Sequence, residues 1–598
     1  MLALSGLAHA APATPPAPAP APAPAEPDPA QPAPAAKPPA SKSRPVIAPT
    51  TPPKSPPPLP ADLKATTPRP ATAAPQAGGF ANLAGKRAAA NRLDVALELL
   101  KLEQSLVDAS RAGRLVHIKL ADVNRAFDSL TGLFFAGRNA EAIEKLQQLE
   151  ESLADAPRSD LQKALDACKL EIDPPLWTTS FPAPPEVPEG SEPKPALAFR
   201  LRQLHEGGDV KLLAGRTVRI IAEPATPGPG TPAQLELGTI RIAETVGETF
   251  RFEQRLDAAA AGKLVTDLLA KTPADNLRIG LVLEGTPVRR SDVNRVQLLA
   301  EPLAAVGQRT RARLEKISPD TAHELTRATL RSRIALATRA PASNEAGRSL
   351  LSLGALAREI DGELTQIAGG KDPYADRTGT WQFTLDDADG SLPVWVHAGK
   401  RQAQAPGLLI ALHGAGGDEA MFPLSYGAGA ARELCERNNL VLVSPKTEPL
   451  MSTPALLDKV IARASHHYGI DSTRIYVLGH SMGAMTAASL ATQRPLTITA
   501  AVCIAGGPLG SVPTSLLRMP PMLVIGAELD NLVAPSRLRP VAERWAAAGL
   551  PVTFKLSGGT GHTLCVGYEL TGAINWLTRQ RMPGAVAGSE QTNTEGSK

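Results

Sequence analysis

The pentapeptide Gly479-His480-Ser481-Met482-Gly483 places a serine between two glycines. Apolar residues 476–478 precede it as a strand would, and residues 484–491 indicate a helix. At a sharp strand-to-helix turn, side chains at the two glycine positions would collide, and the turn lifts the serine hydroxyl out of the sheet. This context predicts that Ser481 is a nucleophile for acyl transfer, with Gly479 and Gly483 supporting it.

A second glycine-rich loop, His413-Gly414-Ala415-Gly416-Gly417, follows the apolar run 408–412. One alternative is a loop that cradles phosphate groups. The lysine and the Ser or Thr of a Walker sequence are missing, and so is the G-x-G-x-x-G spacing of dinucleotide-binding folds. We therefore predict no nucleotide cofactor.

Histidines also raise the question of a metal site, because His466 and His467 are adjacent and His480 follows nearby. The sequence has no H-E-x-x-H motif. Neighbouring residues on a helix point in directions about 100° apart, so the pair is not expected to chelate one ion. The sequence thus predicts no metal and no cofactor of any kind.

The elements around these motifs indicate an α/β fold. A hairpin of two strands, 381–385 and 392–397, opens the segment. Apolar runs that alternate with helical stretches follow it, and this alternation is typical of a doubly wound parallel sheet. The runs are 408–412, 440–444, 475–479, 499–504, 522–526 and 552–556.

With these motifs, residues 378–582 resemble the α/β-hydrolase superfamily, and within it secreted esterases similar to polyhydroxybutyrate depolymerases and feruloyl esterases. The resemblance covers about a third of the chain and implies catalytic residues in the order serine, acid, histidine. His562 is the one histidine after Ser481, so the resemblance implies that it is the general base. It follows the glycine-rich residues 558–561, a loop of the kind in which that base usually lies.

Three acidic residues lie between Ser481 and His562: Glu528, Asp530 and Glu543. Glu543 falls in a helical run and is expected to be a surface charge. Asp530 follows the strand 522–526 and resembles the acid turn of the family, so it is the preferred partner of the histidine. Glu528 stays as the alternative, because the spacing to Asp530 is one residue longer than in the commonest form of that turn.

The loop that begins with His413 and Gly414 resembles the H-G-x oxyanion loop of the same enzymes. The resemblance implies that the backbone N–H groups of Ala415 and Met482 stabilise the developing oxyanion. Each such donor contributes roughly 3 kcal/mol to transition-state stabilisation.

Composition limits the other possibilities. The chain has 598 residues, enough for two or three domains, and its 63 basic and 59 acidic side chains leave a net charge of +4. No nucleic-acid partner is expected from so balanced a charge. The four cysteines are far apart, which favours neither a zinc site nor a disulfide framework. No apolar run is long enough for a transmembrane segment.

The sequences at both ends of the chain are not expected to form part of a folded domain. Residues 1–10 are apolar and end in the small-residue pattern of a signal peptide, although the apolar core is short and lacks a preceding basic residue. We expect a truncated signal peptide and an exported protein, periplasmic or secreted. Residues 11–79 form an Ala/Pro-rich disordered linker, with possible cell-envelope association, and 583–598 a disordered tail.

Between the linker and the hydrolase-like region, the hydrophobic period changes twice. Residues 80–172 have helical spacing and indicate a small bundle, of which 123–153 resembles a single tetratricopeptide unit. Residues 196–300 alternate apolar with polar residues, which predicts a β-rich accessory domain for support rather than glycan binding. A helical connector, 303–370, follows, and its Arg-rich stretch 309–313 is expected to be a solvated face.

Together these features predict an exported serine hydrolase that cleaves carboxylic esters through an acyl-enzyme on Ser481. Its substrate would be a small-molecule or polymeric ester. One alternative is a prolyl-oligopeptidase-like peptidase, but the period of about 50 residues expected of propeller blades is missing. Another is a non-enzymatic envelope interaction protein, which the intact set of catalytic residue types disfavours. Because the segment 506–521 is too short for a helical cap, we also expect an open cleft.

Overall fold

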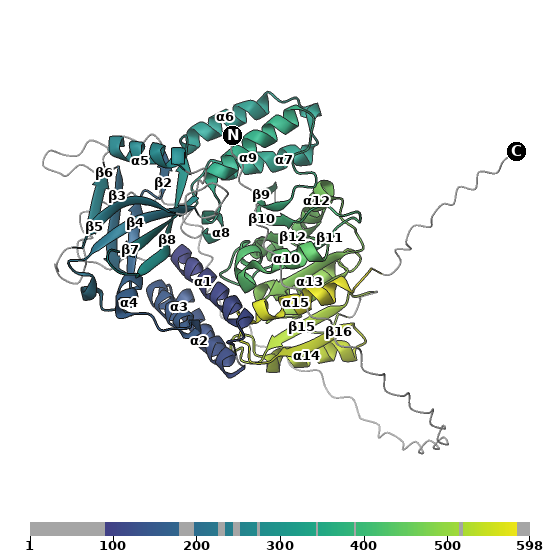
Figure 1. Cartoon of the computed structure of the whole chain (residues 1–598). Coiled ribbons are helices and arrows are strands. Elements are labelled where there is room, and N and C mark those ends of the chain that lie inside the picture. The colour runs from purple at the N-terminus through teal and green to yellow at the C-terminus, as the bar shows by residue number, and fades with distance from the viewer. Residues whose placement is uncertain are drawn as a thin grey trace, which may run out of the picture. The chain divides into compact units, whose positions relative to one another are not determined.

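The computed structural model describes residues 90–115, 117–178, 196–224, 234–242, 252–256, 258–271, 276–341, 345–387, 390–513 and 518–582 (Figure 1). The chain divides into two units, residues 1–79 and 80–598, and every described residue belongs to the second. The expected signal peptide 1–10, linker 11–79 and tail 583–598 lie outside the described residues. Among the described helices, none has the length and apolar character needed to cross a bilayer.

An eight-stranded sheet forms the frame of the C-terminal region, in the order β16-β15-β14-β13-β11-β12-β10-β9. The hairpin β9–β10 is antiparallel, as is the pairing of β10 with β12, and all further neighbours are parallel. Each predicted apolar run forms one of the parallel strands, which confirms the expected α/β class. The strands are β9 (Gly379–Asp387), β10 (Gly390–Ala398), β11 (Gly407–Leu412), β12 (Leu440–Pro445), β13 (Ile475–His480), β14 (Ala500–Ile504), β15 (Met522–Ala527) and β16 (Val552–Ser557).

Helices cover both faces of this sheet, since successive strand residues point to opposite sides. Leu408 and Ile410 join one apolar core, whereas Leu409 and Ala411 join another on the opposite face. Residues of α12, α13 and α14 pack in the first core, and residues of α10 and α15 in the second. The helices are α10 (Ala431–Arg437), α11 (Thr447–Ser452), α12 (Leu456–Tyr468), α13 (Met482–Gln493), α14 (Pro535–Ala547) and α15 (Cys565–Thr578).

The predicted helical connector shares the core of the sheet. Leu330, Ile334 and Ile360 pack in one cluster with Trp381 and Phe383 of β9. The expectation of a solvated arginine face is incomplete, because Arg309 and Arg313 both pair with Asp361 of α9. The connector comprises α6 (Leu303–Glu315), the turn η3 (Pro319–Thr321), α7 (Glu324–Ala337), α8 (Ala346–Ser349) and α9 (Leu353–Ala368).

The β-rich region contains two sheets that share one apolar core. The first is antiparallel, in the order β1-β3-β6, and the second has the order β2-β8-β7-β4-β5, with β2–β8 parallel. Their elements are β1 (Cys168–Asp173), β2 (Leu176–Thr178), β3 (Leu197–Gln203), η2 (Val210–Leu213), β4 (Thr217–Pro224), β5 (Leu235–Arg241), β6 (Phe252–Leu256), α5 (Ala258–Lys271), β7 (Asn276–Leu283) and β8 (Arg289–Leu299).

Two expected boundaries of this region are wrong. Strand β1 begins at Cys168, inside the range 80–172 that we expected to be helical, and β2 precedes the predicted start at 196. The prediction placed the β-rich region after a Pro-rich stretch that begins at Pro174. In the structure Pro174 and Pro175 form the short turn between β1 and β2. A strand of three residues is also too short to show an alternating pattern.

The helical segment comprises α1 (Arg92–Arg111), α2 (His117–Phe135), α3 (Asn139–Leu153) and α4 (Asp160–Asp166). Helix α1 begins with a capping box in which Asn91 and Asp94 each accept the other's backbone N–H. The core of the segment includes Leu102, Phe127 and Ile143, together with Leu564 from the C-terminal region. The segment therefore packs against the region that carries Ser481 and His562.

Candidate active site

Ser481 lies on a sharp turn between β13 and α13, with φ 53° and ψ −116°. These angles are strained for a residue with a side chain, as expected of a nucleophile elbow. A Cβ on Gly479 would lie 2.0 Å from the carbonyl oxygen of Gly483, and a Cβ on Gly483 would lie 2.1 Å from that of Leu412. Gly479 is therefore required by the turn itself, and Gly483 by the close approach of the turn to the end of β11.

His562 joins Ser481 to Asp530 in a continuous hydrogen-bonded chain. The Nε2 atom of His562 lies 2.9 Å from Oγ of Ser481, and its Nδ1 atom lies 2.8 Å from Oδ2 of Asp530. Asp530 is 3% exposed, and its Oδ1 atom accepts the backbone N–H groups of Leu532 and Val533. A carboxylate held in this way keeps the proton on Nδ1, so that Nε2 is free to accept the serine proton.

The structure distinguishes the three candidate acids. Asp530 contacts His562, whereas the Oε2 atom of Glu528 accepts the backbone N–H of Gly559 at 2.7 Å. Glu543 is exposed on α14. Glu528 thus holds the loop that precedes His562, and Asp530 is the residue brought to the imidazole.

The glycine-rich loop after β11 lies beside the serine. A Cβ on Gly414 would lie 3.2 Å from the Cβ of Ser481. His413 is fully buried, donates from Nδ1 to the carbonyl oxygen of Gly414, and accepts the backbone N–H of Thr447 at Nε2. Burial lowers the pKa of His413, so the neutral ring that this pattern requires is favoured.

The two expected oxyanion donors both lie in this neighbourhood. Ala415 lines the same cavity as Ser481. Met482 is the first residue of α13, a position at which a helix provides no internal partner for the backbone N–H. Their role at the oxyanion stays a prediction.

Two further residues hold His562 from inside the domain. His480 donates from Nε2 to the carbonyl oxygen of His562 at 3.0 Å, and Tyr426 donates its hydroxyl to Nδ1 of His480 at 2.8 Å. Tyr426 begins the turn η5 (Tyr426–Gly429), directly after η4 (Met421–Ser425). Burial strongly lowers the pKa of His480, and the nearby His562 lowers it further. His480 was visible in the elbow motif, but no sequence pattern indicated Tyr426.

Helix α2 supplies two contacts that the sequence did not predict. Asn124 accepts the backbone N–H of Gly561 at 2.7 Å, and Asp128 accepts that of His562 at 2.8 Å. They are one helical turn apart and interrupt an apolar face. That interruption is the one signal that could have marked them. Burial raises the pKa of Asp128 to about 6.

A cavity of about 500 Å³ lies over Ser481 and His562. Helices α1, α2 and α3 form one of its walls, so the expectation of an open cleft overlooked the helical segment. Leu532 also lines the cavity and is 51% exposed, so solvent reaches that part of it. The wall from the helical segment includes Arg92, Val95, Leu99, Phe127, Leu130, Phe134 and Leu146.

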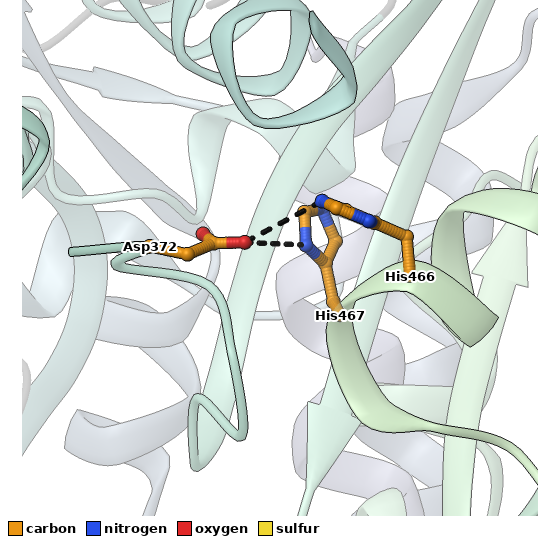
Figure 2. A group of neighbouring side chains, drawn as sticks. All are labelled: Asp372, His466 and His467. Carbon is orange, nitrogen blue, oxygen red and sulfur yellow. Dashed lines mark ion pairs between the residues drawn. The ribbon is translucent and has the colours of Figure 1, made fainter. Parts of the chain in front are cut away.

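A second polar cluster lies outside this cavity. The Oδ2 atom of Asp372 lies 3.5 Å from Nε2 of His466 and 3.8 Å from Nδ1 of His467, and Figure 2 shows both rings next to this one oxygen. Adjacent histidines were not expected to share one ion, yet these two rings approach the same oxygen atom. The two rings present different nitrogens, which compensates for the angle between their positions on α12. Within the described part of the chain, these three residues could hold a metal ion.

No family model and no curated protein matches this chain. Solved structures with a similar fold include a thermostable esterase, at 23% identity and TM-score 0.29, over 34% of this chain and 63% of that one. The S-formylglutathione hydrolase FrmB of Staphylococcus aureus matches at 12% identity and TM-score 0.29, over 34% of this chain and 98% of its own. An acetyl xylan esterase from Aspergillus awamori matches at 15% identity and TM-score 0.28, over 33% of this chain and 99% of its own.

Buried Glu103 on α1 leads to a prediction about stability. Its Oε2 atom accepts the backbone N–H of Gly427 at 3.1 Å, and burial raises its pKa from 4.5 to about 8. Between these values the folded state retains a proton that the unfolded state releases, so the free energy of unfolding falls as pH rises. Glutamine at position 103 would keep an oxygen that accepts the N–H of Gly427, and it has no group that ionises.

We therefore expect Glu103→Gln to gain stability relative to wild type as pH rises. Urea unfolding at about pH 5 and about pH 8 should show the difference growing by more than about 1 kcal/mol. Equal pH dependence in the two proteins would show that Glu103 does not ionise in this range.

Proposed function

We propose that the C-terminal region is an α/β-hydrolase that cleaves carboxylic esters through an acyl-enzyme. The observation that carries the proposal is the chain Ser481–His562–Asp530, with contacts of 2.9 and 2.8 Å, on a strained strand-to-helix turn. A serine, an imidazole and a buried carboxylate in this order form a nucleophile, a base and its orienting group.

In the first half of the reaction, Oγ of Ser481 attacks the ester carbonyl carbon while Nε2 of His562 accepts its proton. The imidazolium that forms is stabilised by Asp530, which stays ionised. His562 then donates the proton to the leaving alcohol oxygen, which leaves the acyl group on Ser481. In the second half, His562 activates a water that attacks the acyl carbonyl, and acid and free serine are released.

The oxyanion formed in each half requires hydrogen-bond donors. The N–H groups of Ala415 and Met482 fill this role in the proposal, since Met482 follows Ser481 directly and Ala415 lines the same cavity. His413 holds the carbonyl oxygen of Gly414 and so fixes the loop that carries Ala415. A preorganised donor of this kind is worth about 3 kcal/mol in the transition state.

The peptidase alternative receives no support from the accessory region. A propeller consists of repeated four-stranded blades around a channel. The described residues between α4 and α6 instead form one three-stranded and one five-stranded sheet around a single core. Export and envelope association remain proposals that rest on residues 1–79.

The experiment compares an ester with the matching amide. The purified chain is assayed on a p-nitrophenyl acyl ester and on the p-nitroanilide of the same acid. We expect kcat/KM to be at least about 100-fold higher for the ester, because p-nitrophenolate leaves without being protonated, whereas the anilide nitrogen must accept a proton before it leaves. Hydrolysis of the anilide at a comparable rate would favour the peptidase alternative.

A further inference from the structure

We propose that helix α2 completes the active site, positioning His562 with Asn124 and Asp128 and selecting esters with an apolar acyl or alcohol group through Phe127 and Phe134. This inference rests on the proposed function of Ser481. It assigns to the helical segment a role in catalysis and substrate choice, in place of the packing role expected from sequence.

The middle of α2 fixes the loop that carries the base. Two successive backbone N–H groups, of Gly561 and His562, donate to Asn124 and Asp128. A Cβ on Gly561 would lie 2.6 Å from Oδ2 of Asp128, so the loop approaches the helix as closely as its backbone allows. Asn124 is fully buried and is held in turn through a bond from Nδ2 to the carbonyl oxygen of Leu120. The contact therefore restrains His562 through its backbone N–H, while His480 holds its carbonyl oxygen.

The C-terminal end of α2 lies against the loop that carries Ala415. A Cβ on Gly416 would lie 2.8 Å from Cε1 of Phe134 and 3.3 Å from Cε1 of Phe135. The guanidinium carbon of Arg92 lies 5.3 Å from the centre of the Phe134 ring, a favourable cation–π distance that helps to fix the ring. Helix α2 thus spans the site from the His562 loop to the loop of Ala415.

The cavity between these two contacts is mainly apolar. Phe127, Leu130 and Phe134 of α2 line it on one side, and Leu424 and Val533 line it from the C-terminal region. Its volume of about 500 Å³ falls in the range of small-molecule sites. An alkyl chain or aryl ring would gain about 25 cal/mol for each Å² of apolar surface removed from water. Either side of the ester bond could supply this group.

Phe134→Ala tests the wall. The ring is partly exposed, so its removal should leave the fold intact. We expect the ratio of kcat/KM for p-nitrophenyl octanoate to that for p-nitrophenyl acetate to fall about 10-fold, because several methylenes lose their contact surface. Leu133→Ala is the matched control on the same helix, and it should keep the wild-type ratio. An unchanged ratio in Phe134→Ala overturns the proposal that Phe134 selects esters with an apolar group.

Binding gives a readout that does not need turnover. Octanoate should raise the melting temperature of the wild type more than acetate does, and Phe134→Ala should lose this difference. If the wild type binds octanoate but hydrolyses neither ester, the proposed function fails, while the proposed binding of an apolar group is supported. If octanoate raises the melting temperature no more than acetate does, the proposed binding of an apolar group is overturned.

The positioning role of Asp128 has its own test. Asp128→Ala should lower kcat on p-nitrophenyl acetate about 10-fold, because the backbone of His562 loses a hydrogen bond that positions it. KM should change little, because the substrate loses no contact. Asp128→Asn keeps an oxygen acceptor and should restore most of kcat. Equal losses in both variants, or a loss that appears only in KM, would overturn the positioning role.

From a separate observation, we infer that Asp372, His466 and His467 bind a divalent transition-metal ion such as Zn²⁺. Bonds of about 2.0–2.1 Å to a tetrahedral ion separate the ligand atoms by about 3.3 Å. The observed separations from Oδ2 of Asp372, 3.5 and 3.8 Å, are close to this value (Figure 2). One carboxylate and two imidazoles are ligands that zinc accepts.

The surroundings of the three ligands support the site. The Nδ1 atom of His467 has no hydrogen-bond partner among the described residues, although its side chain is 1% exposed. Its Nε2 atom lies 3.2 Å from Oγ1 of Thr329, and the second oxygen of Asp372 accepts the backbone N–H of Tyr374 at 2.9 Å. Outer hydrogen bonds of this kind orient metal ligands. The hydroxyl of Thr326 now donates to Oδ2 of Asp372 at 2.9 Å and lies 3.1 Å from Nε2 of His466, so an ion would displace this hydroxyl from the two ligand atoms. It would also satisfy Nδ1 of His467 and join α12 to the segment after α9.

Zinc binding by the full chain tests this site. After removal of metal with EDTA, we expect one equivalent of Zn²⁺ to bind by calorimetry and to raise the melting temperature. The partly exposed ligands permit Asp372→Asn and His466→Ala, each of which should weaken binding by more than about 10-fold. His323→Asn is the control, because that ring stacks on His466 with centroids 4.3 Å apart, and Asn can keep the helix cap that His323 provides by accepting the backbone N–H of Leu325. Absent binding, or binding unchanged in both ligand variants, overturns the site.

Discussion

Ser481→Ala is expected to lower kcat for ester hydrolysis by about 10⁶-fold, the loss seen when a triad serine is removed. The hydroxyl is the atom that forms the acyl bond, and alanine offers no substitute. KM should change little, because the cavity walls stay in place. Steady-state kinetics on p-nitrophenyl acetate measure both quantities.

Ser489→Ala provides the control, since it removes a hydroxyl from an exposed position on the same helix, α13. It should retain full activity. Circular dichroism should show the same fold for both variants. If Ser481→Ala keeps more than about a tenth of the wild-type kcat, Ser481 does not carry the acyl group.

Asp530→Asn should have the next largest effect, lowering kcat about 10⁴-fold. The amide can donate to Nδ1 of His562, which then places the ring proton on Nε2, where it blocks proton transfer from Ser481. The change in volume is small, and the N–H groups of Leu532 and Val533 can still bond to the amide oxygen. Turnover should therefore fall far more than stability.

Glu528→Gln is the matched control for the acid. Glu528 contacts the backbone of Gly559 rather than the imidazole, and Gln keeps an oxygen for that contact. We expect its kcat to stay within about threefold of wild type. A larger loss at Glu528 than at Asp530 would assign the orienting acid to Glu528.

The sequence predicted the parts of the site that local patterns encode. Gly479 is required by the turn around Ser481, Gly483 by the approach of that turn to the end of β11, and the apolar runs of the sheet are long enough to recognise. The choice of Asp530 over Glu528 agrees with the contact in the structure. In each case the relevant residues lie close together in the chain or at the end of a recognisable strand.

What the sequence did not show depends on contacts between distant segments. Asp128 and His562 are 434 residues apart, and nothing in either neighbourhood indicates the other. The wall formed by Phe134 has the same origin, since its helical spacing is equally typical of packing. The approach of His466 and His467 to Asp372 depends on side-chain torsions, which a helical period does not specify.

The most direct measurement of the central claim is the site of covalent labelling by a fluorophosphonate. The wild-type chain is treated with the probe, digested and mapped by tandem mass spectrometry. We predict one phosphonylated residue, Ser481, with labelling slowed at least about 100-fold in His562→Ala because the base is missing. A label on any other residue, or labelling of Ser481 at an unchanged rate without His562, would contradict the proposed mechanism.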